Sequence, residues 1–357
     1  MGRSARASSG FARRVVAWQR AHGRHDLPWQ GSRDPYRVWL SEIMLQQTQV
    51  GTVLAYYERF LARFPDVQAL ARAPLDDVLV LWSGLGYYSR ARNLHRCAQQ
   101  VVDEHGGRWP ASRDALARLP GIGPSTAAAI AAFCHGERVA ILDGNVKRVL
   151  ARHLGISDDL ARPPALRALW ARAEALLPDA ADMPAYTQGL MDLGATVCVA
   201  RRPTCAACPL RADCVAHRDA RVHELPVKSR PIRRGRRSHA LLWLRWRDQL
   251  LLVRRPERGV WAGLWSLPEF TNRSALADAV QGWGRELTDL PTIHHALTHF
   301  DWQLMPVQVQ LPARCSVARR EAIAAALPGA RWFTLTQALQ ASLPAPVRRL
   351  LQAASAD

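Results

Sequence analysis

Four cysteines lie within seventeen residues near the middle of this chain, and no other feature restricts the local fold as strongly. Their spacing is Cys198-x6-Cys205-x2-Cys208-x5-Cys214. Four thiolates at this density can surround one compact inorganic centre. Zinc sites usually combine two short knuckles, whereas this segment has one short pair and four cysteine ligands. The pattern therefore favours a [4Fe–4S] cluster, and a zinc site is the alternative.

The chain is also strongly basic. It has 357 residues and a formal net charge of +18, with 48 basic against 30 acidic residues. Only Lys147 and Lys228 are lysines, so nearly all of the positive charge is arginine. Genomic base composition accounts for arginine in place of lysine, but not for the excess of bases over acids. Such a surplus attracts polyanions, so the sequence indicates a phosphate-rich partner without specifying the chemistry.

No segment has the pattern of an export signal or of a membrane span. The start, Met1 to Gly10, is basic and serine-rich without an apolar stretch, and the apolar run Ala127–Phe133 is too short to cross a bilayer. We therefore expect a cytoplasmic protein that does not bind membranes. Cysteines stay reduced in that compartment, so a tight cysteine group there indicates a metal centre before a disulfide.

Two domains of different texture are expected from the length and the pattern. We place them at residues 11–222 and 238–353, joined by a linker at 223–237. The first domain has apolar residues at helical spacing and no clear strand. The linker contains the proline-rich, basic segment Leu225–Arg237, whose charge either keeps it solvated or helps to hold nucleic acid. The helices expected in the first domain include Val38–Leu45, Val53–Phe60, Val78–Trp82, Ser125–Phe133 and Val146–Leu154.

The second domain has an α+β pattern. Short apolar runs at His239–Trp246 and Gln249–Arg254 flank a polar turn, which predicts a β-hairpin. Further strands are expected at Ile293–Phe300 and Met305–Leu311. Two helical segments are expected near Ser274–Gln281 and Arg319–Ala326.

A glycine-rich turn in the first domain is a candidate phosphate site. Leu119-Pro120-Gly121-Ile122-Gly123 separates two helical segments, and the second begins at Ser125. The glycines Gly121 and Gly123 permit a tight turn with positive φ and exposed backbone amides. Such amides, together with the start of the next helix, bind anions. The pattern is that of a helix–hairpin–helix.

Two acids stand out, and local evidence leaves their roles open. Asp143 falls at an expected helix start, where a carboxylate caps the helix, and capping alone would explain it. Glu42 lies among apolar neighbours in Trp39–Gln49. It is either a surface residue of an amphipathic helix or an acid whose pKa a pocket has raised.

Taken together, the segments resemble the helix–hairpin–helix DNA glycosylases that carry an iron–sulfur cluster, and specifically the MutY-type adenine DNA glycosylases. The matching segments run in order through the first half. They are LPWQ (27–30), WLSEIMLQQTQV (39–50), LWSGLGYYSRARNL (81–94), LPGIGPSTA (119–127), ILDGNVKRVLAR (141–152), MDLGATVC (191–198) and the cysteine group 198–214.

The resemblance implies roles for individual residues. Glu42 would be the general acid that protonates N7 of adenine, and Asp143 would stay ionised to stabilise the oxocarbenium-like sugar. Asn145 would help to order the catalytic water. The adenine would be flipped out of the duplex into a pocket. That pocket would be formed by Leu27, Trp29 and Gln188. Gln47 and Tyr87 would wedge into the base stack near the partner base.

One position bears on the reaction's product. Bifunctional relatives carry a lysine in the hairpin motif that attacks the sugar, and here that position is Ser125. The resemblance therefore implies a monofunctional enzyme that leaves an abasic site. Lys147, four residues after Asp143, is a possible adventitious trap for the sugar aldehyde.

The second domain resembles the Nudix-like domain of the same family. It lacks the array of glutamates that holds magnesium in Nudix hydrolases and has a single acid, Glu269, after the segment Val260–Pro268. The resemblance therefore implies binding without hydrolysis, with recognition of 8-oxoguanine opposite the adenine. The family's Phe-Ser-His loop reads Leu297-Thr298-His299 here, so the hydroxyl and the histidine remain at Thr298 and His299 while the aromatic does not.

The expected partner is double-stranded DNA with A:8-oxoG or A:G mispairs, bound by a monomer. Three alternatives are a bifunctional endonuclease III-like lyase, a non-catalytic DNA-binding protein with a structural metal, and a zinc-dependent nucleic-acid protein. Ser125 argues against the first. The second explains the charge and the cysteines but leaves Glu42 and Asp143 without a reason.

Overall fold

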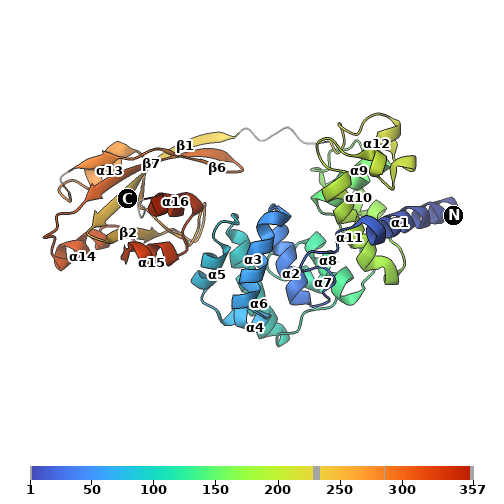
Figure 1. The fold of residues 1–357 in the computed structure, drawn as a ribbon, viewed down its shortest axis with the longest axis horizontal. Helices are drawn as coiled ribbons and strands as arrows, with labels where there is room; N and C mark the ends of the chain where they lie inside the picture. Colours follow the sequence, from blue (N-terminus) through green and yellow to red (C-terminus); the bar gives the residue numbers. More distant parts are fainter. Residues whose placement is uncertain (1, 228–233, 285, 354–357) are drawn as a thin grey trace. The chain divides into compact units, whose positions relative to one another are not determined.

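The computed structural model describes residues 2–227, 234–284 and 286–353, and the chain divides into two compact units (Figure 1). Unit 1 contains Met1–Arg72 and Asn93–Pro231, and unit 2 contains Ala73–Arg92 and Ile232–Asp357. A short segment from the first half of the sequence therefore belongs to the same unit as the C-terminal half. Each unit is described by itself.

In the described residues of unit 1, all of the secondary-structure elements are helices. Its elements are α1 (Gly2–His22), α2 (Pro35–Leu45), α3 (Val50–Arg63), α4 (Val67–Arg72), most of α6 (Ser89–His105), α7 (Arg113–Leu116), α8 (Pro124–His135), α9 (Gly144–Leu154), α10 (Pro163–Ala175), η1 (Ala180–Asp182), α11 (Met183–Asp192), η2 (Leu193–Val197), η3 (Cys205–Ala207), η4 (Arg211–Asp213) and α12 (Val215–Arg218). Among the residues described, no helix of the chain is long and apolar enough to span a membrane.

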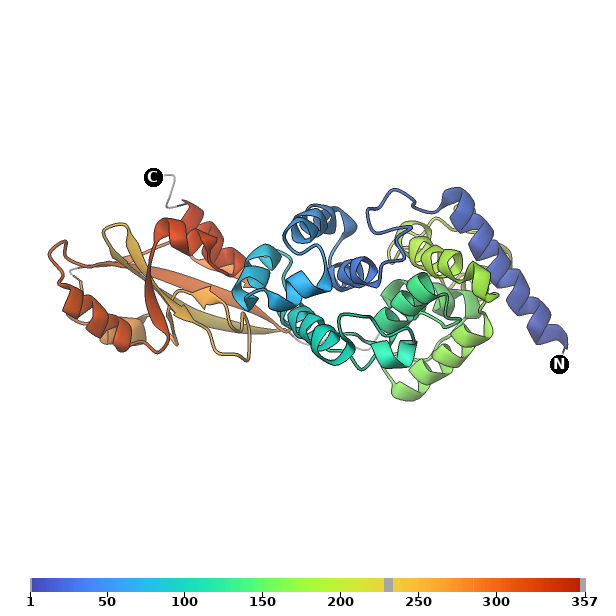
Figure 2. The ribbon, with the colours of Figure 1, turned by 90° about the horizontal axis from the view of Figure 1, so that it is seen from below.

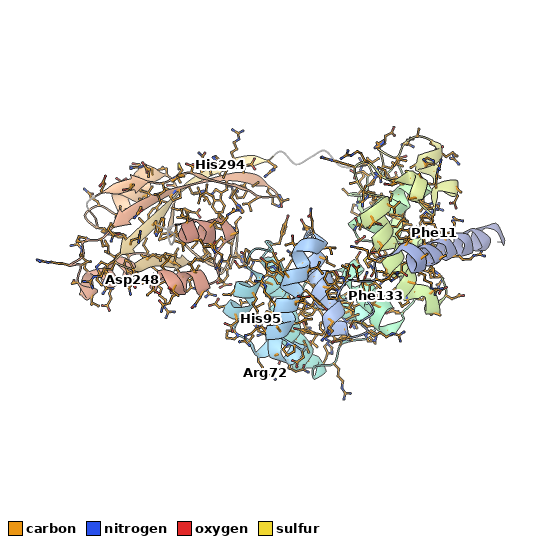
Figure 3. The ribbon with its side chains drawn as sticks, viewed as in Figure 1. Phe11, Arg72, His95, Phe133, Asp248 and His294 are labelled. Carbon is orange, nitrogen blue, oxygen red and sulfur yellow. The ribbon has the colours of Figure 1, made fainter. Side chains whose placement is uncertain are left out.

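Helix α8 is central to unit 1 because its side chains are small. Every residue of Thr126–Ala132 is buried, and five of the seven are alanine. Small side chains let neighbouring helices approach closely, and α8 contacts α2, α7 and α11. Helix α1 packs along α11, and Figure 2 shows α1 as the long helix at the N-terminus. Phe11 of α1, labelled in Figure 3, packs on His153 of α9 with ring centroids 4.7 Å apart.

Unit 2 is an eight-stranded mixed sheet with short helices. Its central strands run in the order β3-β2-β1-β7-β5, with β4 paired to β1, β6 to β7 and β8 to β2. The strands are β1 (Gly235–Trp246), β2 (Gln249–Arg254), β3 (Trp265–Ser266), β4 (Glu269–Phe270), β5 (Leu287–Asp289), β6 (Ile293–Ala296), β7 (Phe300–Gln310) and β8 (Ala330–Thr334). The helices are α5 (Leu75–Trp82), α13 (Arg273–Ala279), α14 (Val317–Ala325), α15 (Leu335–Gln340) and α16 (Ala345–Ala353).

Strand β1 forms the centre of this sheet. It pairs with β7 in parallel over its whole length and with β2 and β4 in antiparallel fashion. Its run Ala240–Leu244 is buried without alternation, as expected for a strand covered on both faces. The segment 73–92 is tied to this unit by polar contacts. Arg254 of β2 forms a two-bond ion pair with Asp76, with both N–O distances 2.7 Å, and Arg92 donates to the carbonyl of Ala262 at 2.7 Å.

Most of the secondary structure expected from sequence is confirmed. The five helical segments of the first half fall within α2, α3, α5, α8 and α9, and the first hairpin is β1–β2. The two helical segments of the second half correspond to α13 and α14.

The single strand expected at Ile293–Phe300 is wrong. Strand β6 ends at Ala296, and a turn over Leu297–His299 leads into β7, with Ala296 opposite Asp301. The segment Met305–Leu311 falls almost entirely within β7, which is longer than expected. In the expected linker, residues 228–233 lie outside the described residues, and β1 begins at Gly235.

Two glycines that end helices offer a matched stability test. Gly136 ends α8 and Gly155 ends α9, both with left-handed φ near +66°. A Cβ at Gly136 would meet nothing within 4 Å, whereas one at Gly155 would lie 2.3 Å from Val215 Cγ1. We expect Gly136→Ala to cost about 1 kcal/mol from backbone strain, and Gly155→Ala to cost a further 1–3 kcal/mol, approximately, from overpacking. Thermal unfolding of the two variants measures the difference, and equal shifts would contradict it.

Candidate active site

Helix α2 positions Glu42. Pro35 begins the helix, and Asp34 caps it by accepting from the backbone N–H of Tyr36 at 2.9 Å. The apolar side chains of α2 are turned into unit 1, where Trp39 and Leu40 are fully buried. Glu42 is the only acid in the helix. It is therefore held against the core by the burial of its neighbours.

A pocket opens beside Glu42. The three residues that the sequence assigned to a base pocket, Leu27, Trp29 and Gln188, line it together with Glu42. Phe133 of α8, labelled in Figure 3, also lines this pocket. Trp29 is buried and packs edge-on against Tyr57, with centroids 5.2 Å apart. The structure thus gathers side chains from four separate segments around one carboxyl group.

The surroundings of Glu42 change its acidity. Burial raises the pKa of Glu42 to about 8, from an ordinary value of 4.5, and the nearby charge of Asp143 adds to the rise. The carboxyl still has an opening to water through the pocket, because the residue is only partly buried by surface area. A carboxyl of this kind is protonated at neutral pH and can give up its proton to a bound group.

Asp143 caps helix α9. Its carboxylate accepts from the backbone N–H of Val146 at 2.7 Å, so the capping expected from local sequence is present. Burial raises its pKa, while the hydrogen bonds from Val146 and Asn145 and the charges of Arg148 and Lys147 oppose that rise. Asp143 lies close enough to Glu42 for the two charges to interact. The same carboxylate can therefore both cap the helix and act at the site.

Arg148 connects this end of α9 to the first cysteine. Its guanidinium donates to the Asn145 side-chain oxygen at 2.8 Å and to the Gly194 carbonyl at 2.7 Å. A third bond reaches the carbonyl of Cys198 at 2.8 Å. Gly194 must be a glycine in this arrangement, because a Cβ there would lie 2.6 Å from the Cβ of Asn145. Asn145 is therefore fixed by the segment that leads into the cysteines.

The four cysteines lie close together and are unbridged. Cys198 and Cys208 pack against the main core of unit 1, while Cys205 and Cys214 pack on a small cluster around Ala216. Burial raises the pKa of Cys208 to about 11, and the charges of the other three thiols contribute. Within the described residues, no group of three or more His, Cys, Asp or Glu side chains is arranged to hold a metal ion.

Sequence reasoning missed one buried acid beside the pocket. Asp192 is fully buried and accepts from the backbone N–H of Arg24 at 3.0 Å and from the Arg24 side chain at 2.6 and 2.8 Å. It also accepts from the amide of Gln188 at 2.9 Å. This bond uses one N–H of the Gln188 side chain and fixes the orientation of its amide beside the pocket. Asp192 was visible in the MDLGATVC segment, but its partner lies 168 residues earlier.

The hairpin motif is present, with one correction. The turn between α7 and α8 places Gly121 at φ +76°, where a Cβ would lie 2.7 Å from the Asn93 Cβ. Gly123 was also expected to use positive φ, and this is wrong. It caps α8 with φ −83°, and a Cβ there would meet nothing within 4 Å. Ser125 lies in the first turn of α8, at the position discussed for a catalytic lysine.

Two residues expected to wedge into DNA have strained backbones. Gln47 follows α2 at φ +57°, and Tyr87 has φ +46°. Non-glycine residues with positive φ are uncommon, and they concentrate at functional sites. Tyr87 is 45% exposed, unusually high for a large aromatic residue in this structure. In unit 2 its hydroxyl lies 3.1 Å from the hydroxyl of Thr298.

Tyr87, Thr298 and His299 line one pocket of unit 2. Its wall also contains Trp261, which sequence reasoning did not single out. Trp261 stacks on Trp302 with centroids 4.7 Å apart and adopts φ +57°. The two flanking glycines, Gly259 and Gly263, are the sequence feature that could have indicated its importance.

Comparison with known proteins places this geometry in a family. A model described as the HhH-GPD superfamily base excision DNA repair protein matches residues 40–174, and a NUDIX domain model matches residues 239–353. An adenine DNA glycosylase from Buchnera aphidicola subsp. Acyrthosiphon pisum (strain APS) is 32% identical over 349 residues, which cover 96% of this chain and 97% of that protein. The chain belongs to the adenine DNA glycosylase family.

Other relatives agree with this assignment. The adenine DNA glycosylase of Homo sapiens is 32% identical over 410 residues, covering 96% of this chain and 74% of that protein. Among solved structures, a thermostable thymine-DNA glycosylase is similar with a TM-score of 0.55 and 29% identity, covering 60% of this chain and 98% of the other. A non-covalent endonuclease III–DNA complex, 20% identical with a TM-score of 0.50, covers 62% of this chain and 99% of the other and has the same fold.

Membership in the family makes the chain an enzyme of base excision repair, an adenine DNA glycosylase, with a helix–hairpin–helix domain and a Nudix-like domain. The helix–hairpin–helix domain corresponds to the helical unit, and the Nudix-like domain corresponds to the unit with the mixed sheet.

The raised pKa of Glu42 predicts a pH-dependent stability difference. Because the pKa in the folded state is about 8 and the ordinary value is 4.5, Glu42 is ionised in the unfolded chain but still protonated in the folded state between these pH values, so the folded state loses stability relative to the unfolded chain as the pH rises. Glu42→Gln removes this loss. We expect its stability advantage over the parent protein to be absent near pH 4.5 and to grow towards pH 8, by at most about 1.4 kcal/mol per pH unit. Thermal unfolding across this range measures it.

The matched control is Glu58→Gln, on the exposed side of α3. Its effect on the unfolding temperature should be the same at pH 5 and pH 8. A Glu42→Gln advantage that does not change with pH would show that the folded state holds this carboxyl in an ordinary environment.

Proposed function

We propose that this protein removes adenine paired with 8-oxoguanine or guanine, by hydrolysing the N-glycosidic bond and leaving an abasic site. One observation carries the proposal. A carboxyl with a pKa of about 8, Glu42, lines a pocket formed with Leu27, Trp29 and Gln188. The aromatic rings of Trp29 and Phe133 in its lining suit a flipped purine, and the side-chain carbonyl of Gln188 suits its exocyclic amine.

The chemistry needs two carboxyl groups in different states. Glu42, protonated at neutral pH, donates its proton to N7 of adenine as the bond to the sugar breaks. The electrons of that bond leave with the base, and positive charge develops on the sugar. Asp143, as a carboxylate, stabilises this positive charge. Its two backbone hydrogen bonds and the nearby cations favour the ionised form of Asp143. Water then bonds to the sugar carbon, and its proton restores Glu42.

The positioning of water falls to Asn145. Its side-chain oxygen is occupied by Arg148 at 2.8 Å, so the amide NH2 group is the end left to contact solvent. Ser125 in place of a lysine supports a single reaction step without strand cleavage. Lys147 lies next to the site and could trap the sugar aldehyde, so a trapping experiment tests whether the strand is cleaved. Borohydride trapping with an intact strand fits the proposal, whereas rapid β-elimination would indicate a lyase.

The donor set of the cysteine loop, four thiols in one segment, fits a [4Fe–4S] cluster, although the described side chains are not arranged around a metal ion. All four are free thiols that interact with one another electrostatically, and they belong to one loop of unit 1. When bound, the cluster would supply four metal–sulfur bonds that hold the loop. That loop carries the exposed Arg201 and Arg202 between the first two cysteines. Held in place, these guanidinium groups would face phosphates, and the amides of Gly121 and Gly123 would bind the backbone nearby.

Recognition of the partner base would fall to the pocket of unit 2. The hydroxyl pair of Tyr87 and Thr298 and the exposed His299 supply polar groups at its rim. Leu297 replaces the family's aromatic, so stacking at that point is lost. Glu269, the single acid after the segment Val260–Pro268, forms an ion pair with Arg255 and lies 3.5 Å from the ring of His239. This supports binding without hydrolysis.

A single-turnover assay on duplexes containing A:8-oxoG, A:G and A:C tests the proposal as a whole. We expect excision of adenine, fastest opposite 8-oxoguanine, with the strand left uncut until alkali treatment. Absence of excision from all three duplexes by the intact protein would refute it.

The role of Glu42 has its own test. Glu42→Gln keeps the shape of the side chain but removes the acidic proton, so we expect at least about a hundredfold loss of single-turnover rate. Affinity for duplex DNA should be unchanged. The parent enzyme should also slow tenfold per pH unit above about pH 8, because only protonated Glu42 is active. Retained turnover in the variant would remove Glu42 from the acid role.

The role of Thr298 is tested by a matched pair. Thr298→Ala removes the hydroxyl that lies 3.1 Å from Tyr87, while Thr298→Ser keeps it. One hydrogen bond contributes about 1 kcal/mol, so we expect the preference for A:8-oxoG over A:G to fall about fivefold in the alanine variant. The serine variant should keep the preference. Equal discrimination in all three proteins would exclude this hydroxyl from lesion reading.

A further inference from the structure

Arg152, in the last turn of α9, is buried to an extent that is rare for an arginine. Only 2% of the residue is exposed. Its side-chain hydrogen bonds in the described residues go to the cysteine loop or to the segment that follows the loop. Its guanidinium donates to the carbonyls of Val199 at 2.8 Å, Ala200 at 3.2 Å and Leu225 at 2.9 Å. It also reaches both the carbonyl of Cys198, at 3.3 Å, and its sulfur, at 3.4 Å.

These bonds satisfy the donors of Arg152 but not its charge. In the part of the chain that the structure describes, Arg152 has no ion pair with a carboxylate, although surface arginines of the same region do, such as Arg218 with Asp219. An unpaired buried cation is costly, because the low-dielectric interior cannot replace the solvation by water. Carbonyl dipoles reduce this cost without cancelling the charge. Among the described residues, the charge of Arg152 is therefore stabilised by carbonyl dipoles and not by a carboxylate.

The position of Arg152 indicates where a negative charge would compensate it. Its side chain touches Cys198 Sγ, and its backbone carbonyl lies 3.5 Å from Cys214 Sγ, so one residue meets two of the four cysteines. An iron–sulfur cluster with four thiolate ligands carries net negative charge. The contacts also join both ends of the loop, since Val199 and Ala200 precede the remaining cysteines and Leu225 follows them.

We propose that Arg152 is the buried counter-charge of the cluster, and that it holds both the cluster and its reduction potential in place. The proposal rests on the [4Fe–4S] centre proposed above. A cation at hydrogen-bond distance from a ligand sulfur stabilises the more negative, reduced form of a cluster and so raises its potential. Arg148 also interacts electrostatically with Cys198, but its hydrogen bonds in the described residues go to carbonyls and to Asn145 and not to sulfur. Arg152 is thus a positioning residue for the cluster and has no contact with the candidate base pocket.

The test compares Arg152→Met, which removes the charge and keeps much of the stem, with Arg152→Lys, which keeps the charge and loses the fork of donors. Arg138→Met is the matched control, since Arg138 also bridges two carbonyls, those of Leu177 and Pro178, but does so away from the cysteines. Each full-length holoprotein is measured for iron content, visible absorbance, cluster loss to a chelator, and midpoint potential at an electrode.

We expect Arg152→Met to shift the one-electron redox equilibrium about tenfold towards the oxidised form, or about 59 mV more negative. Cluster loss to the chelator should be about tenfold easier or more. Arg152→Lys should stay near the parent potential but lose the cluster more readily, and Arg138→Met should match the parent in both measurements.

An unchanged potential in Arg152→Met would overturn the proposal, and so would equal shifts in the methionine and lysine variants. If Arg152→Met retains no cluster, its potential cannot be measured, and the test then depends on the Arg152→Lys variant. A cluster at the parent potential supports the role of charge, and a colourless lysine variant contradicts it. An iron-free parent protein would instead refute the proposed cofactor, which is a different failure.

Discussion

The hydrogen bond from the backbone N–H of Val146 to the carboxylate of Asp143, 2.7 Å long, begins helix α9 and also fixes an acid beside Glu42. Helix α9, which this bond starts, contacts α10, α11, α12 and η2 in unit 1. Asn145 and Arg148 extend from its first turns, and Arg152 enters the cysteine loop from its last. A capping residue usually serves only its helix. Here the capping carboxylate also lies close enough to Glu42 to raise its pKa, so the start of the helix and the acidity of Glu42 are linked.

The surroundings of the two carboxyl groups shift their pKa values for different reasons. Both are buried, but Asp143 receives backbone hydrogen bonds and faces two cations, whereas the shift of Glu42 is caused by burial and by the charge of Asp143. An ionised Asp143, as the proposed mechanism requires, would raise the pKa of Glu42 and so help to keep that carboxyl protonated. When two neighbouring carboxyl groups have different environments, one can be protonated and the other ionised at the same pH.

The sequence predicted the elements well, because helical spacing, hairpin turns and the cysteine spacing are local signals. It could not choose between a surface role and a pocket role for Glu42, because that depends on segments as distant as Gln188. The Arg24–Asp192 pair and the contact between Tyr87 and Thr298 join residues 168 and 211 positions apart, and no local pattern reports such pairs. The strand expected at Ile293–Phe300 failed for a different reason. Apolar residues stand on both sides of the turn, at Ala296, Leu297 and Phe300, so the sequence looks continuous across the break at Leu297.

The membership of residues 73–92 in unit 2 has a consequence for dissecting the protein. Part of the folding unit that contains the sheet is encoded more than 140 residues before its first strand, and Asp76 and Arg92 supply bonds that the C-terminal half cannot supply for itself. A fragment starting at the sheet would expose the partners of those bonds, including the guanidinium of Arg254. A fragment ending before the sheet would carry α5 without the surface on which it packs. The boundary useful for making separate pieces of this chain is therefore not a single point in the sequence, and complementation between two fragments that overlap at residues 73–92 would be the natural way to divide it.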